Sequence, residues 1–242
     1  MPLPKITTPT YELELPSSGK KVKYRPFLVK EEKVLILALE SQDTKQITNA
    51  IKQVLKDCVM TRGVKIEELP TFDIEYLFLN VRGKSVGEAI ELVVTCYDDG
   101  EGTQVPVTIY TDDVQVQKDP EHTPDIKLDD ELVLRMKYPS LEQFVKNNFD
   151  FSDESEDNIE KSFDIISSCI EMVYNAEDSW AAADCTKKEL KDFVEQLSSK
   201  QFKEIEKFFE TMPKLSHTIN VKNPNTGVNN EVTLEGLTSF FG

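Results

Sequence analysis

Residues 200–242 read KQFKEIEKFFETMPKLSHTINVKNPNTGVNNEVTLEGLTSFFG, and this stretch carries the strongest structural signals in the chain. Large apolar side chains recur every three or four positions from Phe202 to Met212. That spacing puts them on one face of a helix, so the stretch predicts an amphipathic helix. Pro213 is expected to end it, because proline lacks a backbone N–H and clashes with the preceding turn.

Two β-prone segments, 217–222 and 228–234, follow this helix and flank the sequence Asn-Pro-Asn-Thr-Gly. These tip residues favour turns, so the stretch predicts a β-hairpin. The chain then closes on an apolar cluster that ends in Phe240 and Phe241. Adjacent aromatic rings need cover from water, so we expect them to fill an apolar groove beside the preceding helix or on a partner.

Aromatic side chains often act as the buried anchors of protein interfaces. Further candidate contact surfaces are the proline-rich arm 2–9 and the apolar helix segment 34–39. Packing within the protein's own core is the competing interpretation for the helices. The candidate partner-binding residues are Phe202, Phe208, Phe209, Phe240 and Phe241.

The amino-terminal part of the chain predicts a hairpin followed by helices. Residues 11–15 and 22–25 alternate apolar and polar side chains around Pro-Ser-Ser-Gly, which is typical of a hairpin. A helix is predicted from Val29, and its segment 34–39 is apolar on every side, which predicts burial all round. Asp43 is expected to cap the start of the next helix.

A third helix is predicted over residues 73–82, and Gly83 and Gly87 are expected to break it. The middle of the chain is richer in strands. Segments 90–97 and 104–110 predict a second hairpin around Asp-Asp-Gly-Glu-Gly. Shorter strands are predicted at 114–116 and 132–136.

Residues 150–160 contain six acids and no base, which predicts an exposed linker or loop. A short helix is predicted before it, from Pro139. After it, apolar residues at helical spacing predict one long helix over 159–173. Thr186-Lys-Lys-Glu189 then predicts a capping box at the start of another helix.

These elements predict an α+β fold that is predominantly helical, with two or more β-hairpins and helices packed around a small antiparallel β region. We expect three parts along the chain. Residues 1–149 form an amino-terminal α+β region, 150–160 an acidic linker or loop, and 161–242 a helical carboxy-terminal region that ends in a β-hairpin and a short helix.

Composition excludes several classes of function. The 242 residues carry a net charge of −16, from 44 acids and 28 bases, and phosphate backbones repel such a chain. We therefore expect no nucleic-acid partner. No apolar run approaches the ~18 residues of a membrane span, so we expect no membrane partner. The four cysteines never form C-x-x-C, which favours reduced, buried thiols.

Sequence patterns for bound ligands are incomplete. The triplet Gly83-Lys-Ser85 could end a phosphate loop, but Phe78 stands where that loop needs its first glycine, so we interpret the triplet as a helix stop. Each hairpin tip is placed where a zinc knuckle would put cysteines, yet Cys96 is the only thiol there. We expect no metal, no cofactor and no catalytic residue, and hence no enzyme.

Three blocks of the sequence resemble the baseplate hub subunits of T-even-type contractile-tailed phages. They are TPTYELELPSSGKKVKYRPFLVKEEKVLILALES at 8–41, LPTFDIEYLFLNVRGKSVGE at 69–88, and MPKLSHTINVKNPNTG with LEGLTSFFG in 212–242. They stand in the family's order and cover about half of the chain.

The resemblance implies a structural component or assembly factor of the central baseplate hub, acting through contacts with other hub and tail proteins. It implies a place in the virion tail baseplate, with host cytoplasm as the site of assembly. The alternative is a transient chaperone-like assembly protein for another hub component, not retained in the virion. A tail enzyme that cleaves peptidoglycan is a third class, which would need paired carboxylates in a groove.

Overall fold

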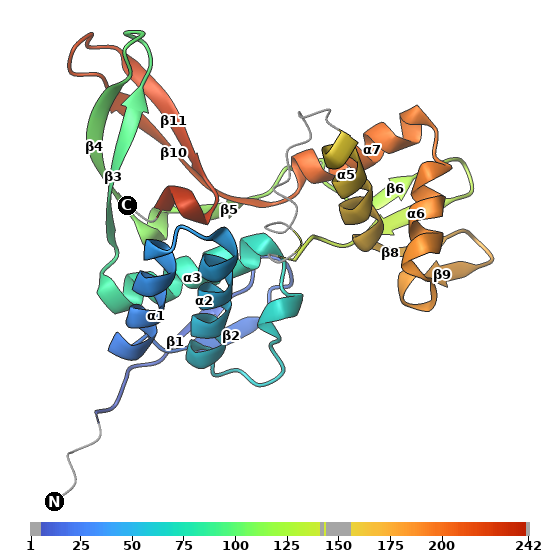
Figure 1. Cartoon of the computed structure of the whole chain (residues 1–242), viewed down its shortest axis with the longest axis horizontal. Helices are drawn as coiled ribbons and strands as arrows, with labels where there is room; N and C mark the ends of the chain where they lie inside the picture. Colours follow the sequence, from blue (N-terminus) through green and yellow to red (C-terminus); the bar gives the residue numbers. More distant parts are fainter. Residues whose placement is uncertain (1–5, 141–142, 144–155, 241–242) are drawn as a thin grey trace, which may run out of the picture. The chain divides into compact units, whose positions relative to one another are not determined.

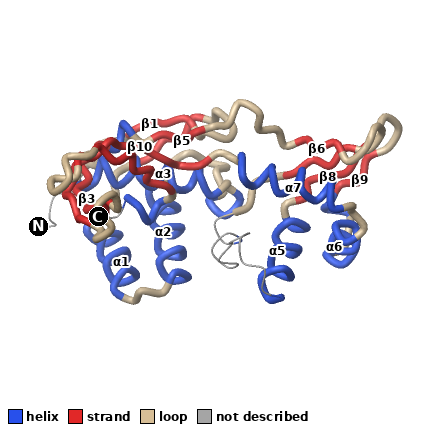
Figure 2. The backbone as a smooth tube through the Cα atoms, turned by 90° about the horizontal axis from the view of Figure 1, so that it is seen from above, coloured by secondary structure: helices blue, strands red, loops and turns tan. Residues whose placement is uncertain are grey.

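The computed structural model describes residues 6–140, 143 and 156–240, without the side chains of 44, 156–159, 237 and 238. These ranges contain six α-helices and eleven β-strands in four sheets (Figure 1; Figure 2). The fold is a mixture of helix and strand, so the prediction of a predominantly helical protein is wrong. The prediction missed strands of three to five residues, which are too short to show clear alternation.

The chain divides into two compact units. Unit 1 comprises residues 1–117 and 214–242, and unit 2 comprises residues 118–213. The carboxy-terminal hairpin thus belongs with the amino-terminal part of the chain, and the expected boundaries at 149 and 161 fall inside the span of unit 2. Most of the acidic stretch and of the short helix expected after Pro139 lies outside the described residues. No described helix is long and apolar enough to cross a bilayer.

Unit 1 combines a small hairpin, three helices and two larger hairpins (Figure 1). Its paired strands are all antiparallel among the described residues. In chain order its elements are β1 (Tyr11–Glu14), β2 (Lys21–Tyr24), α1 (Val29–Glu40), α2 (Thr44–Cys58), the 3-10 turn Ile66–Glu68, α3 (Thr71–Val86), β3 (Ala89–Cys96), β4 (Thr103–Tyr110), the 3-10 turn Thr111–Asp113, β5 (Gln115–Gln117), β10 (Lys214–Lys222), β11 (Asn229–Glu235) and the 3-10 turn Leu237–Phe240.

Helix α3 lies in the interior of unit 1, with nine buried residues among its sixteen. The buried carboxylate of Asp73, in its first turn, accepts hydrogen bonds from the Ser17 backbone N–H at 3.0 Å and from the Ser17 hydroxyl. A negative charge is favourable there because the helix dipole and free N–H groups point at it. The contact anchors the β1–β2 turn to α3.

Glycine at position 83 permits close packing and does not stop the helix. Helix α3 runs through Gly83 and ends at Val86, and Gly87, whose φ is 120°, caps it. A Cβ atom on Gly83 would lie 2.9 Å from Oγ1 of Thr111, so only glycine fits without a shift. The predicted break is confirmed at Gly87 and wrong at Gly83. The triplet Gly83-Lys-Ser85 is helical, and Oγ of Ser85 accepts a hydrogen bond from the Phe27 N–H at 2.9 Å.

The two larger hairpins lie side by side (Figure 1) and share an apolar core. Strand β3 pairs with β4 from Ala89–Tyr110 to Cys96–Thr103, and β10 pairs with both β11 and β5. Both predicted hairpins are therefore confirmed. The shared core contains Leu79, Ile90, Leu92, Val94, Cys96, Ile109, Val114, Leu215, Val221, Leu234 and Phe240.

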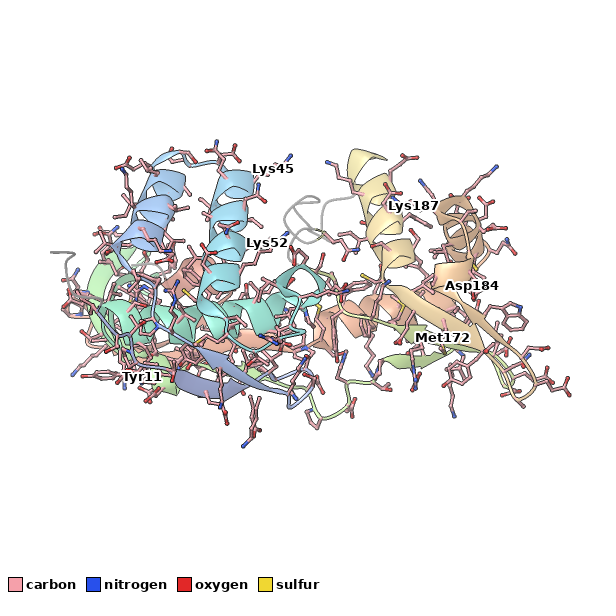
Figure 3. The ribbon with its side chains drawn as sticks, turned by 90° about the horizontal axis from the view of Figure 1, so that it is seen from below. Tyr11, Lys45, Lys52, Met172, Asp184 and Lys187 are labelled. Atoms are coloured by element: carbon pink, nitrogen blue, oxygen red, sulfur yellow. The ribbon has the colours of Figure 1, made fainter. Side chains whose placement is uncertain are left out.

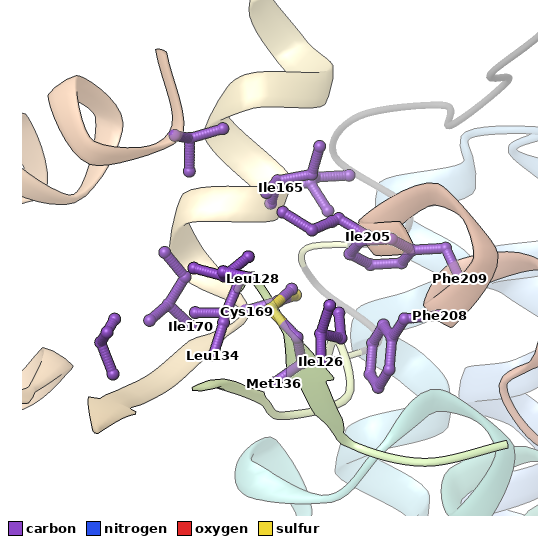
Figure 4. Close-up of a cluster of buried hydrophobic side chains, with 13 residues drawn as sticks. Ile126, Leu128, Leu134, Met136, Ile165, Cys169, Ile170, Ile205, Phe208 and Phe209 are labelled. Carbon is purple, nitrogen blue, oxygen red and sulfur yellow. The ribbon is translucent and has the colours of Figure 1, made fainter. Parts of the chain in front are cut away.

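The described residues of unit 2 form a four-stranded antiparallel sheet in the order β6-β7-β8-β9 and three helices. Its core joins side chains from the sheet, α5 and α7, including Leu134, Ile165, Ile205 and Phe208 (Figure 4). Its elements are β6 (Asp125–Lys127), β7 (Val133–Met136), α5 (Glu156–Ser168), β8 (Ile170–Tyr174), β9 (Ser179–Ala181), the 3-10 turn Ala182–Asp184, α6 (Lys187–Glu195) and α7 (Ser199–Thr211).

The long helix expected over 159–173 is wrong beyond Ser168. The chain changes there from α5 to strand β8, because the Cys169 carbonyl accepts the Lys137 N–H at 2.7 Å and cannot continue a helix ladder. Ile170 and Val173 are β-branched residues that suit a strand, and their spacing matches a helix by coincidence. Tertiary pairing with β7 and β9 decides the conformation.

Candidate interaction surfaces

The tips of the two hairpins in unit 1 are joined by side-chain hydrogen bonds. In the β3–β4 turn, Oδ1 of Asp99 accepts the backbone N–H groups of Glu101 and Gly102, each at 3.0 Å. Its other oxygen accepts the hydroxyl of Thr103. The turn therefore holds Asp99 in place before any contact with the second hairpin.

Asn223, at the end of β10, makes the central contact between the tips. It is 0% exposed, and its Nδ2 donates to Oδ1 of Asp98 at 2.8 Å and to Oδ2 of Asp99 at 3.1 Å. Asp98 also accepts hydrogen bonds from the hydroxyl of Thr226 and from Nδ2 of Asn230, the latter at 2.9 Å. Together these bonds hold the two tips side by side.

The same contacts set the charge state of the tips. The hydroxyl of Thr226 and the amide of Asn223 lower the pKa of Asp98. The hydroxyl of Thr103, followed by Asn223, lowers the pKa of Asp99. Both carboxylates are therefore ionised at neutral pH, and each is satisfied by neutral donors without a cation.

Metal ligands do not gather at these tips. The described residues include no group of three or more His, Cys, Asp or Glu placed to hold a metal ion. Cys96 points into the core between the hairpins, and burial raises the pKa of its thiol. The expectation that the chain binds no zinc stays a prediction.

Helix α1 exposes an apolar face, contrary to the prediction that it is buried all round. Only Glu31, Leu35 and Ala38 are buried on it. The exposed fractions are 79% for Val29, 49% for Ile36 and 56% for Leu37. Helices α1 and α2 lie side by side and project from the rest of unit 1, so α1 packs along one side only (Figure 2; Figure 3).

A buried ion pair fixes the start of α1. The Glu31 carboxylate accepts Nη2 of Arg25 and the Leu28 N–H, both at 2.8 Å, and its side chain is 3% exposed. Burial alone would raise the pKa of Glu31, but these hydrogen bonds outweigh it and lower the pKa to about 2. Removing Arg25 would leave the buried Glu31 charge to the exposed Lys30, whose Nζ lies 3.2 Å away.

Four of the five aromatic residues predicted to bind partners are distributed over two cores. Phe208 and Phe209 are buried in unit 2, where Phe202 packs against the same core. Phe240 is 1% exposed in the core of unit 1, and Phe241 lies outside the described residues. The groove that Phe240 fills is made by α3 and the hairpins, so the expectation that it packs beside the 202–209 helix is wrong. A partner-binding role for these residues stays a prediction, and burial favours the core alternative.

His122 is a structural residue of unit 2. Its Nδ1 lies 2.9 Å from the Thr211 hydroxyl and its Nε2 lies 3.0 Å from the Tyr138 hydroxyl. The ring also packs against Tyr138 and Phe208, and burial lowers the pKa of His122. Both ring nitrogens lie within hydrogen-bond distance of hydroxyl groups, so this neutral imidazole contributes to the packing of unit 2.

A groove of about 510 Å³ in unit 2 runs between β6 and α7. Asp125 lines it, but both oxygens of Asp125 bond Arg135, at 2.7 Å from Nε and 2.7 Å from Nη2. The Arg135 guanidinium lowers the pKa of Asp125, which suits an ion pair and not a proton donor. The remaining charged side chains along the groove include both acids and lysines.

Comparison with known families identifies the class of protein. Residues 8–242 match the family model described as T4 bacteriophage base plate protein, which is nearly the whole chain. The chain therefore belongs to this family and is a baseplate protein of the T4 type, placed in the tail of the virion. No curated protein and no solved structure matches the chain.

Sequence reasoning missed the two contacts that organise unit 1. Asn223 and Asp98 are separated by 125 residues, and Ser17 and Asp73 by 56. Each of these residues has a sufficient local explanation as a turn or cap residue. The only available signal was that both hairpin tips are rich in Asp, Asn and Thr, which are side chains that can bond each other.

Proposed function

We propose that this baseplate protein is a structural component of the central hub and acts through protein–protein contacts. The resemblance of three sequence blocks to hub subunits supports this proposal, and so does the outer side of the β3–β4 hairpin, which exposes Val93, Pro106 and Tyr110 beside polar residues. We propose these exposed apolar residues as the docking site for a hub partner.

The outer surface of the β3–β4 hairpin carries the proposal. Strand β3 alternates buried and exposed residues, and Val93 on the exposed face is 63% accessible. Its cross-strand neighbour is the exposed Pro106, and Tyr110, 55% accessible, stands opposite Ala89 on the same face. We call Val93, Pro106 and Tyr110 the outer hairpin face.

This face is well suited to a protein partner. Valine, proline and the tyrosine ring are apolar, and exposed apolar surface of this kind marks contact sites. Tyrosine also supplies a hydroxyl that can bond across an interface. The bonds between the tips hold the face in one conformation, which lowers the entropy cost of docking.

The proposal is tested by complementing a phage that lacks the gene with Val93→Asp. Because Val93 is exposed, its replacement leaves folding intact, and we expect defective baseplates by electron microscopy. Met60→Asp is the matched control, since Met60 is a similarly exposed apolar residue of unit 1 that lies outside both larger hairpins. Normal baseplates with Val93→Asp would show that the outer hairpin face is not the docking surface.

A transient assembly protein for another hub component is the second candidate. The net charge of −16 favours it, because a strongly acidic protein suits temporary shielding of a partner against aggregation. Both candidates use protein contacts and neither needs an active site. They differ in whether the chain remains in the finished particle, and that difference can be measured directly.

A further inference from the structure

The exposed side of α1 forms a short ridge with one charge on each side of its apolar centre. We define the α1 ridge as Val29, Lys33, Ile36, Leu37 and Glu40, which fall on one side of the helix at 3.6 residues per turn. All five are exposed. Glu31, Leu35 and Ala38 occupy the opposite, buried side.

An apolar helix face in water is normally covered. A helix that packs on one side only should carry polar residues on the other, and α1 carries Ile36 and Leu37 at the middle of that other side. Their exposure within unit 1 indicates a partner. The chemistry of that partner follows from the charges beside them.

The charges of the ridge are arranged to match a copy of the same ridge. Lys33 stands three residues before Ile36, and Glu40 stands three residues after Leu37. If a second α1 lies antiparallel with its midpoint over this one, Lys33 of each helix is level with Glu40 of the other. A parallel arrangement would instead place Lys33 beside Lys33 and Glu40 beside Glu40, which is repulsive.

Neither charge has an ion partner within its own described chain. The salt bridges of the neighbouring Lys30 and of Arg25 go to Glu31, and none among the described residues involves Lys33 or Glu40. Both are thus available for a contact between copies. A two-fold axis requires this self-complementary kind of surface, in which one residue pairs with another and the reverse pair forms as well.

We propose that the α1 ridge is the interface of a homodimer, in which two α1 helices cross antiparallel over Ile36 and Leu37 with Lys33 of each chain paired to Glu40 of the other. One helix from each copy makes a small contact, so the expected dissociation constant is about 10–100 μM. The dimer is independent of the proposed hub role and uses a different surface from the outer hairpin face.

Analytical ultracentrifugation of the full chain tests the dimer. We expect concentration-dependent dimerisation of the parent protein and a monomer for Leu37→Asp, with an unchanged melting temperature because Leu37 is exposed. Met60→Asp is the matched control, since Met60 is similarly exposed in unit 1 but lies outside the ridge, and it should dimerise like the parent. A parent chain that stays monomeric, or a Leu37→Asp variant that still dimerises, would overturn the proposal.

Charge reversal tests the antiparallel arrangement. Lys33→Glu alone and Glu40→Lys alone each place like charges together at both ends of the interface, so each should weaken the dimer about tenfold or more. The double variant Lys33→Glu/Glu40→Lys restores opposite pairs and should dimerise nearly as well as the parent. Failure of the double variant to recover would contradict this register. If the parent protein is monomeric and Leu37→Asp still abolishes its function in assembly, the ridge binds a different protein.

Discussion

Nδ2 of Asn223 lies 2.8 Å from Oδ1 of Asp98, and this hydrogen bond joins the tip of hairpin β10–β11 to the tip of hairpin β3–β4. The two residues come from distant parts of the chain, so the bond also ties the carboxy-terminal segment to the middle of unit 1. A neutral amide is suited to this position because it can donate to two carboxylates at once.

Replacing Asn223 should loosen the hairpin pair. Asn223→Ala removes donors to two carboxylates in a buried position, and we expect a loss of about 1–3 kcal/mol in the free energy of unfolding, measured by urea denaturation. Asn223→Asp should destabilise the protein more at pH 7, because it places a third carboxylate beside Asp98 and Asp99. That extra loss should shrink as the pH falls and the new carboxyl becomes protonated.

Asn229→Asp is the control for this pair of variants. It adds the same charge to the same hairpin at an exposed position opposite Lys222, so its stability should stay within about 0.5 kcal/mol of the parent. Equal effects of Asn223→Asp and Asn229→Asp would mean that the tip contact contributes nothing specific.

Structural elements that depend on local chemistry could be predicted from the sequence. Asp43 caps α2 through the N–H groups of Lys45 and Gln46, as its position before a helical pattern indicated. The Thr186–Glu189 capping box is formed, with the Thr186 N–H 2.7 Å from the Glu189 carboxylate. Such signals depend on residues a few positions apart and survive in any tertiary context.

Features that depend on distant partners could not be predicted in this way. The apolar composition of α1 gave no sign of which side faces α2, so complete burial was the natural but wrong inference. Gly83 resembled a helix stop because glycine often ends helices. The close packing against Thr111 that requires glycine there depends on a residue distant in the sequence. Strand β8 continued a helical spacing by chance, and only pairing with β7 reveals it as a strand.

Glu31 should make the stability of unit 1 depend on pH. The pKa of Glu31 is about 2 in the folded protein, below its ordinary value of 4.5, so the folded state binds fewer protons. The stabilisation is therefore fully present above pH 4.5 and is lost as the pH falls towards 2. We expect Glu31→Gln to cost about 3 kcal/mol at pH 7 by urea unfolding and progressively less below pH 4.5.

Glu32→Gln provides the matched control, because Glu32 lies in the same helical turn and does not bond Arg25. Its effect at pH 7 should be small. A Glu31→Gln variant whose deficit is the same at pH 7 and pH 3 would contradict the assignment of this pH dependence to the Arg25–Glu31 pair.

Gly83→Ala should destabilise the protein although alanine is the better helix former. The helix preference of alanine contributes about 0.5–1 kcal/mol, whereas forcing a methyl group against Thr111 costs about 1–3 kcal/mol. A net loss is therefore expected in thermal unfolding followed by circular dichroism. Adding Thr111→Ala should recover part of it, and a stabilised Gly83→Ala protein would show that the contact relaxes freely.

Phe240→Ala should be strongly destabilising, because the ring is completely enclosed between α3 and the hairpins. Truncating a buried phenylalanine costs about 3–5 kcal/mol. Tyr97→Ala removes an aromatic ring that is 76% exposed and should change stability little. Similar unfolding midpoints for Phe240→Ala and the parent in urea would place Phe240 outside the core.

Quantitative mass spectrometry of purified particles tests the central claim that the chain is a structural part of the baseplate hub. Mature virions, isolated tails and hub subassemblies released from them would be compared with the lysate of infected cells. The proposal predicts a fixed ratio of this chain to the other baseplate proteins in virions and tails, and its enrichment in the hub fraction. Abundance in the lysate with absence from virions and tails would contradict the structural role and favour the transient assembly protein.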